Sequence, residues 1–409
     1  IDPLAIMQSQ DRRIIAIGRH DLMTMPVIGW ITRRIGSQPV IRRAELERGV
    51  SDPEFAKKIN KRSMLTMANC IASGHAAIVM PEGKSHQDTK MHALRTGALR
   101  FALSAASIAH ARELPQPVIQ PVGLHFRCHF WFRTDVFVEF GEPITIPLLE
   151  DPQHHTSLAE GEWLEPPAEQ VIPLRDELYE SLTHITPNAP DWETYRAWHL
   201  LGHLRANSST SPLGSLKQEV LAARDIREQL TLIENNDSLV EDAKEAADIL
   251  HSVGLDARTL DVRGRIKSES RLERGALGVL AMLLTAPLTI PTTGLQAFIG
   301  WYAGDHTDEG IDSRTTHHMI GALFSPLFLW PLISLAFFYS LCGVTSLLPV
   351  YLAVSLPIIH MSNLVFLWGY DMLTDFNDSR TRRRLASSAT GGRLEELVGQ
   401  LGPRLGVLK

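Results

Sequence analysis

The chain has 409 residues and a formal net charge of −6, with 44% hydrophobic and 21% charged residues. The acidic balance does not favour a nucleic-acid partner, and the length allows two or three domains, or one domain followed by membrane segments. The three cysteines lie far apart and form no metal-ligand spacing, which is typical of free thiols in a reducing compartment.

Apolar runs alternate with helical patterns over residues 1–147. We expect short strands at 13–17, 39–41, 75–80, 117–126 and 135–140, and helices at 22–35, 53–73 and 97–112. Strands separated by helices of about 15 residues predict an α/β fold, with a mostly parallel sheet covered by helices. The proline-, acid- and histidine-rich residues 148–170 predict a loop, and the charged residues 174–260 predict a mainly helical region.

The composition becomes apolar near residue 275. Residues 319–341 and 346–370 are each long enough to span a bilayer, and we interpret 319–370 as a helical hairpin. Residues 275–304 also lack charge but contain Pro287 and Pro291, so we interpret them as re-entrant or interfacial. Basic residues on both flanks place both ends in the cytoplasm and favour an even number of crossings. The expected regions are an α/β domain (1–147), a charged helical region (148–270), a membrane region (271–375) and a basic cytoplasmic tail (376–409).

A polar turn after the apolar run 76–80 is the centre of the predicted site. The run stops at Pro81, and the turn that follows consists of Glu82, Gly83, Lys84 and Ser85. A strand end next to a helix start is where α/β folds place anionic ligands. Gly83 lets a backbone approach closely, and Lys84 and Arg95 supply positive charge for a phosphate. A charged surface turn is the alternative interpretation of the same spacing.

Four sequence blocks follow one another over residues 1–143. They are Ile-Asp-Pro-Leu-Ala at 1–5, Gly-Ser-Gln-Pro-Val-Ile-Arg-Arg at 36–43, Pro-Glu-Gly-Lys-Ser-His at 81–86 with Leu-Arg-Thr-Gly at 94–97, and Val-Ile-Gln-Pro-Val at 118–122. Together with Phe-Gly-Glu-Pro-Ile at 140–144 they resemble the glycerolipid acyltransferase family, the glycerol-phosphate and lysophosphatidate acyltransferases. Residues 182–193, the helical middle and the membrane hairpin resemble its long subgroup, the glycerol-3-phosphate or dihydroxyacetone-phosphate acyltransferases.

The resemblance implies a reaction in which an acceptor hydroxyl loses its proton to a His base while it attacks an acyl thioester. Asp2 would orient that His, as the acid does in a Ser-His-Asp triad, and the His should lie five residues before Asp2, upstream of Ile1. Glu82 would belong to the catalytic block. The residues that the resemblance assigns to substrate binding are Arg42, Arg43, Gly83, Lys84, Ser85, Arg95 and Pro121.

Other histidines fit the site less well. His251 and Asp256 repeat the His-x4-Asp spacing, but they lie far beyond the third block, and we interpret this as a chance match. We interpret His86 as a polar loop residue. The pairs at 154–155 and 317–318 have no matching carboxylate or cysteine at a usual spacing, so no metal site is expected. No Gly-x-Ser-x-Gly elbow is present, which disfavours a serine hydrolase.

We therefore expect a membrane-bound O-acyltransferase of phospholipid synthesis. It would move a fatty acyl group from acyl-CoA or acyl-carrier protein to glycerol 3-phosphate or dihydroxyacetone phosphate, with no further cofactor. Its partners would be these substrates and membrane lipids, without nucleic acid, in a multi-pass membrane protein whose catalytic domain is cytoplasmic. Two alternatives stay open: acylation of 1-acylglycerol 3-phosphate, and an inactive lipid-binding scaffold of the same fold.

Overall fold

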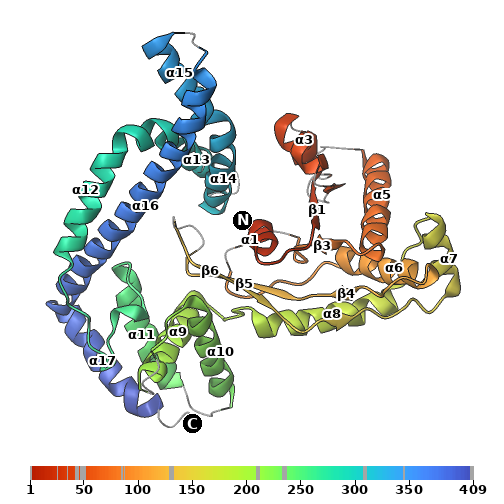
Figure 1. Ribbon diagram of the computed structural model, residues 1–409. Coiled ribbons are helices and arrows are strands. Elements are labelled where there is room, and N and C mark those ends of the chain that lie inside the picture. Colours follow the sequence, from red (N-terminus) through yellow and green to blue (C-terminus); the bar gives the residue numbers. More distant parts are fainter. Residues whose placement is uncertain are drawn as a thin grey trace. The chain divides into compact units, whose positions relative to one another are not determined.

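The computed structural model describes residues 2–24, 26–34, 36–41, 46, 52–83, 86, 88–128, 133–208, 212–232, 237–306, 311–343 and 346–405. The chain divides into two compact units (Figure 1). The N-terminal unit contains residues 2–125 and 136–190. The C-terminal unit contains residues 126–135 and the chain from Asp191 onward. Most of the described chain is helical, and a small parallel sheet lies in the N-terminal unit.

The parallel sheet has three short strands in the order β2-β1-β3. These are β1 (Ile14–Arg19), β2 (Gln38–Val40) and β3 (Ala76–Ile78). Ile17 lies opposite Gln38, and Ile14 lies opposite Ala76. Helices α2 (His20–Thr24) and α3 (Pro26–Arg34) connect the first two strands, and α5 (Pro53–Ala72) connects the second to the third. The parallel pairing is confirmed for these three strands only, because the strands predicted at 117–126 and 135–140 lie in separate two-stranded sheets.

Two helices form the core beside this sheet. Helix α5 begins where the Asp52 carboxylate accepts a hydrogen bond of 3.1 Å from the Phe55 N–H, with Pro53 in the first turn. It packs on α6 (Gly97–Ala111), which is alanine-rich and therefore allows close approach. In α6 the side chains of Leu103 and Ile108 are fully buried. The two helices thereby cover the apolar residues around the sheet.

The chain after α6 differs from the prediction in two places. The strand expected at 117–126 is divided into β4 (Val118–Ile119) and β5 (Val122–Phe126), because Pro121 has no N–H to donate to a strand partner. These pair with β7 (Ile144–Thr145) and β6 (Val136–Phe140), respectively.

The loop predicted at 148–170 is wrong in its central part. Residues Pro152–Glu160 form helix α7, which the Asp151 carboxylate caps through the Gln153 N–H and which ends at Gly161, where φ is 94°. Helix α8 (Ala168–Ile185) follows, and its apolar face is buried in the core of the N-terminal unit. The capping residues, rather than hydrophobic periodicity, identify α7.

The C-terminal unit has an ordinary helical core. It is built from α9 (Trp192–Ser208), α10 (Leu216–Thr231), α11 (Asp237–Ser252) and α17 (Ala389–Leu405) (Figure 1). Leu201, Leu250 and Leu394 are among the fully buried side chains of this core. The helical pattern predicted for 174–260 is confirmed. The residues expected to form a basic tail contribute α17 to the same core.

Residues 126–135 belong to this unit through two arginines. The Arg127 guanidinium donates to both carboxylate oxygens of Glu219, at 2.7 and 3.0 Å, and both side chains are largely buried. Burial alone would lower the pKa of Arg127, but the ion pairs with Glu219 and Asp135 outweigh burial and raise it. The more exposed Arg133 donates to Asp371 at 2.7 and 2.8 Å.

Within the described chain, three helical runs are long and apolar enough to cross a membrane. They cover residues 272–302, 317–342 and 348–386. The elements involved are α12 (Leu272–Thr289), a π-helical turn (Ile290–Gly294), α13 (Leu295–Asp305), α14 (Ile311–Phe324), a second π-helical turn (Ser325–Leu329), α15 (Trp330–Cys342) and α16 (Leu348–Ala386). The first run stays helical through Pro287 and Pro291, so its length suffices for a crossing where we predicted a re-entrant or interfacial segment.

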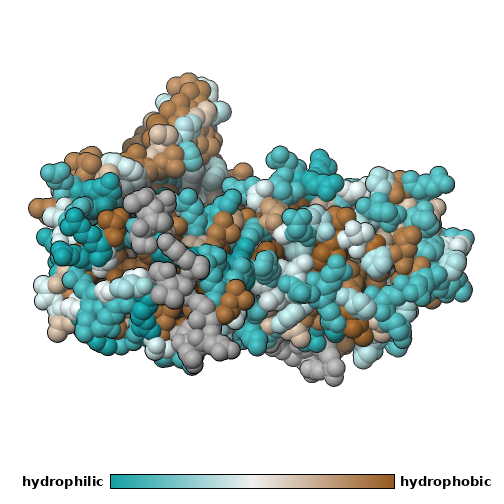
Figure 2. Space-filling model, turned by 90° about the horizontal axis from the view of Figure 1, so that it is seen from below, coloured by the Kyte–Doolittle hydropathy of each residue, from teal (hydrophilic) through white to brown (hydrophobic). Residues whose placement is uncertain are grey.

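Helices α12 and α16 lie side by side and run antiparallel (Figure 1). Gly278 faces the Gly369 backbone so closely that an added Cβ would lie 2.7 Å from the Gly369 oxygen. Small residues of this kind allow helices to approach closely in lipid. Many large hydrophobic side chains of these helices are exposed, and hydrophobic colouring covers part of the face that the space-filling view shows (Figure 2).

Candidate functional site

The candidate site is the loop that connects β3 to α6. The Arg95 N–H donates to the Pro81 carbonyl at 2.7 Å and closes the loop at its base. Gly83 has a φ of +69°, in the left-handed region that favours glycine. A Cβ added to Gly83 would lie 3.2 Å from Cγ of Arg95. Gly83 and Arg95, both predicted from the sequence, are therefore adjacent at the start and end of the loop.

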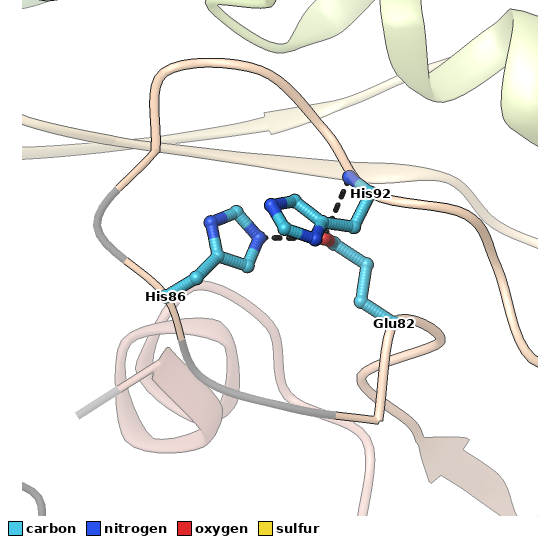
Figure 3. A group of neighbouring side chains, drawn as sticks. All are labelled: Glu82, His86 and His92. Atoms are coloured by element: carbon cyan, nitrogen blue, oxygen red, sulfur yellow. Dashed lines mark hydrogen bonds and ion pairs between the residues drawn. The ribbon is translucent and has the colours of Figure 1, made fainter.

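The Glu82 carboxylate holds the interior of this loop (Figure 3). Its Oε2 atom lies 2.6 Å from Nε2 of His86 and accepts a hydrogen bond of 2.9 Å from the His92 backbone N–H. Nδ1 of His86 accepts the Asp88 backbone N–H at 3.2 Å. The proton of a neutral His86 is therefore on Nε2, which donates to Glu82. One carboxylate oxygen thus fixes both His86 and the backbone at His92.

The two histidine rings of the loop stack on each other. Their centroids are 4.0 Å apart and their planes differ by 29°. His92 has a carboxylate partner of its own, because its Nε2 lies 2.6 Å from Oδ2 of Asp88. The side chains of Glu82, His86 and His92 are between 19% and 29% exposed. The group is therefore partly shielded from water but open to a ligand.

The far side of the loop is attached to the segment after α8. The buried Thr89 hydroxyl donates to the Ala189 carbonyl at 2.9 Å, and the Met91 N–H donates to the Asn188 side-chain oxygen at 3.3 Å. These partners lie in residues 182–193, the segment that resembles the long acyltransferase subgroup. The structure gives this segment a local role, because it anchors the loop that carries Glu82.

The structure describes only some of the other site residues that we predicted from the sequence. Pro121 is buried, and its carbonyl accepts a hydrogen bond of 3.0 Å from the Gly141 N–H, which joins the fourth block to the 140–144 motif. Asp2 begins helix α1 (Asp2–Gln8), but its side chain lies outside the described part of the structure. Four further residues lie outside the described residues, and their roles stay predictions: Arg42, Arg43, Lys84 and Ser85.

The second His-x4-Asp spacing has a structural explanation. Asp256 begins a 3-10 turn (Ala257–Thr259), where it accepts hydrogen bonds from Arg258, and it lies 3.8 Å from the Arg127 guanidinium. Burial would raise the pKa of this carboxyl, but Arg258 and Arg127 outweigh burial and lower it. Asp256 thus has arginine partners, whereas His251 is exposed. This agrees with the interpretation of the spacing as a chance match.

The histidine and carboxylate network of the loop was not predicted from the sequence. Its signal is nevertheless present as two carboxylate–histidine pairs with a spacing of four, Glu82 with His86 and Asp88 with His92. Such spacing normally indicates a helical surface. Here the residues lie in a loop, where the hydrogen bond from the His92 N–H to Glu82 and the stacking of the two rings join the pairs.

Comparisons with known proteins agree with the block pattern. Residues 1–125 match the family model described as Acyltransferase. Glycerol-3-phosphate O-acyltransferase 2 of Saccharomyces cerevisiae is 28% identical over 142 residues, which cover 34% of this chain and 18% of that protein. An uncharacterized acyltransferase of Schizosaccharomyces pombe is 30% identical over 135 residues, which cover 32% of this chain and 17% of that protein.

The chain thus matches less than a fifth of the length of these two curated relatives. No solved structure matches the chain. The family model and both relatives are nevertheless all described as acyltransferases. The residues that match the family model contain the parallel sheet, α5, α6 and the Glu82 loop. Residues 1–125 therefore form an acyltransferase domain, which is similar to the two named yeast proteins over about a third of this chain.

Proposed function

We propose that this chain carries out O-acylation of a glycerol phosphate at a membrane surface. The donor is an acyl thioester, acyl-CoA or acyl-carrier protein, and the acceptor is glycerol 3-phosphate or dihydroxyacetone phosphate. The observation that supports this most is the Glu82 loop, which is fixed by hydrogen bonds at both ends and in its interior within the domain that matches acyltransferases. The yeast relative that is named a glycerol-3-phosphate acyltransferase supports the acceptor class.

The reaction joins the acceptor hydroxyl oxygen to the acyl carbonyl carbon and breaks the thioester carbon–sulfur bond. The hydroxyl proton passes to a His base, which we expect upstream of Ile1, and the His then gives this proton to the leaving thiolate. Asp2 would orient that His and stabilise its charged form. No protein nucleophile is needed, because the acceptor oxygen attacks directly.

The loop would bind the phosphate end of the acceptor. Arg95 lies beside Gly83, where the backbone can come close to a ligand. Arg42, Arg43 and Lys84 would add positive charge, with Ser85 as a further polar contact. The three apolar runs of the C-terminal unit would keep the protein at the bilayer, where acyl chains and lipid products are found. Their basic flanks favour a cytoplasmic active site.

The test is acyl transfer by membranes that contain the chain extended upstream to include the expected His. Labelled glycerol 3-phosphate, dihydroxyacetone phosphate and 1-acylglycerol 3-phosphate are offered separately. Product from either of the first two supports the proposed acceptor. Product from the third alone assigns the next acylation step instead. If the protein is inserted and none of the three is acylated, the proposed activity is wrong and a lipid-binding scaffold becomes the better interpretation.

The Glu82→Ala variant tests the site itself. It removes the hydrogen bonds that fix His86 and His92, and we expect acyl transfer to fall at least about 100-fold, the scale on which positioned catalytic groups act. The exposed Glu160 at the end of α7 provides the matched control, and Glu160→Ala should keep the parent rate. Extraction of both variants with the membrane fraction shows that insertion is intact. A normal rate in Glu82→Ala would exclude the loop from the active site.

A further inference from the structure

The Glu82 loop brings together three groups that bind metal ions. Glu82, His86 and His92 each offer one ligand atom, and these three atoms all lie within 4.8 Å of one another (Figure 3). One carboxylate oxygen and two imidazole nitrogens, with a fourth position left for water, make up a set that zinc uses in proteins. We propose that Glu82, His86 and His92 bind a divalent transition-metal ion of the zinc class, with Asp88 as an outer carboxylate.

The orientation of His92 suits a metal ligand. Its Nε2 lies 2.6 Å from the Asp88 carboxylate, so Nε2 carries a proton and Nδ1 is the remaining nitrogen. The ligand nitrogen of His92 lies within 4.8 Å of the ligand atoms of Glu82 and His86. An unprotonated ring nitrogen this near a carboxylate oxygen is unfavourable without a cation. A cation between the two groups turns this repulsion into two attractive contacts.

His86 can become a ligand without loss of a proton from the site. Its Nε2 lies 2.6 Å from Glu82, where the metal would replace the present proton. The proton then moves to Nδ1, which lies 4.0 Å from Oδ2 of Asp88. A small rotation lets Nδ1–H donate to this oxygen in place of accepting the Asp88 N–H. Asp88 would then orient both histidines, as outer carboxylates do in zinc sites.

The distances require only side-chain movement. With metal–ligand distances near 2.1 Å, neighbouring ligand atoms of a tetrahedral zinc ion are about 3.4 Å apart. The Glu82–His86 contact of 2.6 Å must therefore open, and the other separations, which are within 4.8 Å, must adjust toward this value. Hydrogen bonds of Arg95 and Thr89 hold the loop backbone at its base and on its far side. The ligand residues are therefore already close together before a metal ion binds.

The binding test needs no acyl donor or acceptor, so its outcome is independent of the proposed transferase activity. The full chain is purified in detergent and dialysed against micromolar Zn²⁺, and bound metal is counted by elemental analysis. We expect His86→Gln and His92→Gln each to weaken Zn²⁺ binding at least tenfold. Asp88→Ala should weaken it by about 10- to 100-fold, the effect of losing an outer carboxylate.

The chain offers a matched control in His110 and His155. Their rings are also close, with centroids 5.3 Å apart, and they belong to α6 and α7 of the same unit. His110→Gln and His155→Gln should leave Zn²⁺ affinity unchanged. If His86→Gln and His92→Gln bind Zn²⁺ as tightly as the parent chain, or if the parent chain keeps no ion, the proposed site is wrong.

A spectroscopic variant separates ligation from a loss of folding. With Co²⁺ as the probe, the parent chain should show the visible absorption of a tetrahedral site. His92→Cys should retain Co²⁺ and add a near-ultraviolet sulfur-to-cobalt charge-transfer band, because the thiolate takes the place of Nδ1. The same substitution at His155 should add no such band. A Co²⁺-loaded His92→Cys chain without this band would show that residue 92 is not a ligand.

Discussion

The two units of the molecule differ in how far their apolar helices are buried by protein. In α6 of the N-terminal unit, Leu103 and Ile108 are 0% exposed, and neighbouring helices cover them. In α12 of the C-terminal unit, Leu283 is 66% and Leu284 is 73% exposed, although the helix is just as apolar. The first unit therefore completes its core with protein alone. The second has helices whose outward faces need an apolar solvent, and a bilayer provides one.

The charges near these helices follow the same division. Asp371 and Asp375 occur in the C-terminal half of α16, and each is paired with arginine: Asp371 with Arg133, and Asp375 with Arg271 and Arg274. The preceding residues of the helix, Leu348 to Tyr370, carry no charged side chain apart from any protonated histidine. The paired carboxylates therefore indicate where the apolar section of α16 ends. Four experiments test how burial determines the contribution of side chains, first between the two units and then within the C-terminal unit.

The largest difference should come from equal substitutions in the two units. Leu103→Ala removes a fully buried side chain and should destabilise the N-terminal unit by about 2–5 kcal/mol. Leu284→Ala removes a side chain that is 73% exposed and should change stability by less than about 0.5 kcal/mol. Hydrogen exchange of peptides from α6 and α12, measured by mass spectrometry, reports each effect locally. Equal losses in both units would contradict the proposed bilayer contact of α12.

A second comparison concerns ion pairs within the C-terminal unit. Arg127→Met leaves the largely buried Glu219 carboxylate without its two hydrogen bonds and should cost up to about 3 kcal/mol. Arg133→Met breaks a pair whose side chains are 42% and 46% exposed, and it should cost less than about 1 kcal/mol. Thermal unfolding in detergent measures both variants. A larger effect at Arg133 would mean that its pair with Asp371 is more shielded than its exposure indicates.

The contact between α12 and α16 can be tested at its closest point. Gly278→Leu places side-chain atoms against the Gly369 carbonyl and should destabilise the helix pair by about 1–3 kcal/mol. Gly392 in α17 has no atom within 4 Å of an added Cβ, so Gly392→Ala should be neutral or stabilising by up to about 1 kcal/mol. The two variants are compared by the fraction of protein that stays monodisperse in detergent after heating. An unchanged Gly278→Leu protein would show that the two helices are not in close contact.

The smallest effect should be a pH dependence of the helical core. His203 in α9 is 5% exposed, and burial, with the charge of Lys267, lowers its pKa. The folded chain therefore binds this proton less readily than the unfolded chain, so stability is lost as the pH falls below about 6.5, the ordinary value for histidine. We expect His203→Leu to show a smaller drop in melting temperature between pH 7.5 and 5.5. The exposed His251 is the control, and His251→Gln should keep the parent slope.

Sequence patterns predicted the elements that depend on local signals. Asp52 and Pro53 mark the start of α5, and the apolar run before Pro81 contains β3. The division of the strand at Pro121 could have been predicted, because proline has no N–H to donate to a strand partner. The hydrogen-bond network of the loop could not have been predicted. It depends on contacts between Thr89 and Ala189 and between Met91 and Asn188, which are about a hundred residues apart in the sequence. Hydrophobic periodicity carries no information about such polar contacts.

The hydrogen bond from the Arg95 N–H to the Pro81 carbonyl has a consequence for how these enzymes diverge. It closes residues 82–94 into a ring at the point where β3 ends and α6 is about to begin. The entropy of closing a loop grows only with the logarithm of its length, so doubling the loop costs about 0.6 kcal/mol. A change in loop length therefore costs the strand and the helix little, although between His86 and His92 it would alter the contacts of Asp88, Thr89 and Met91. If this loop binds the acceptor, as we propose, a change in its length offers a route by which acceptor preference can change.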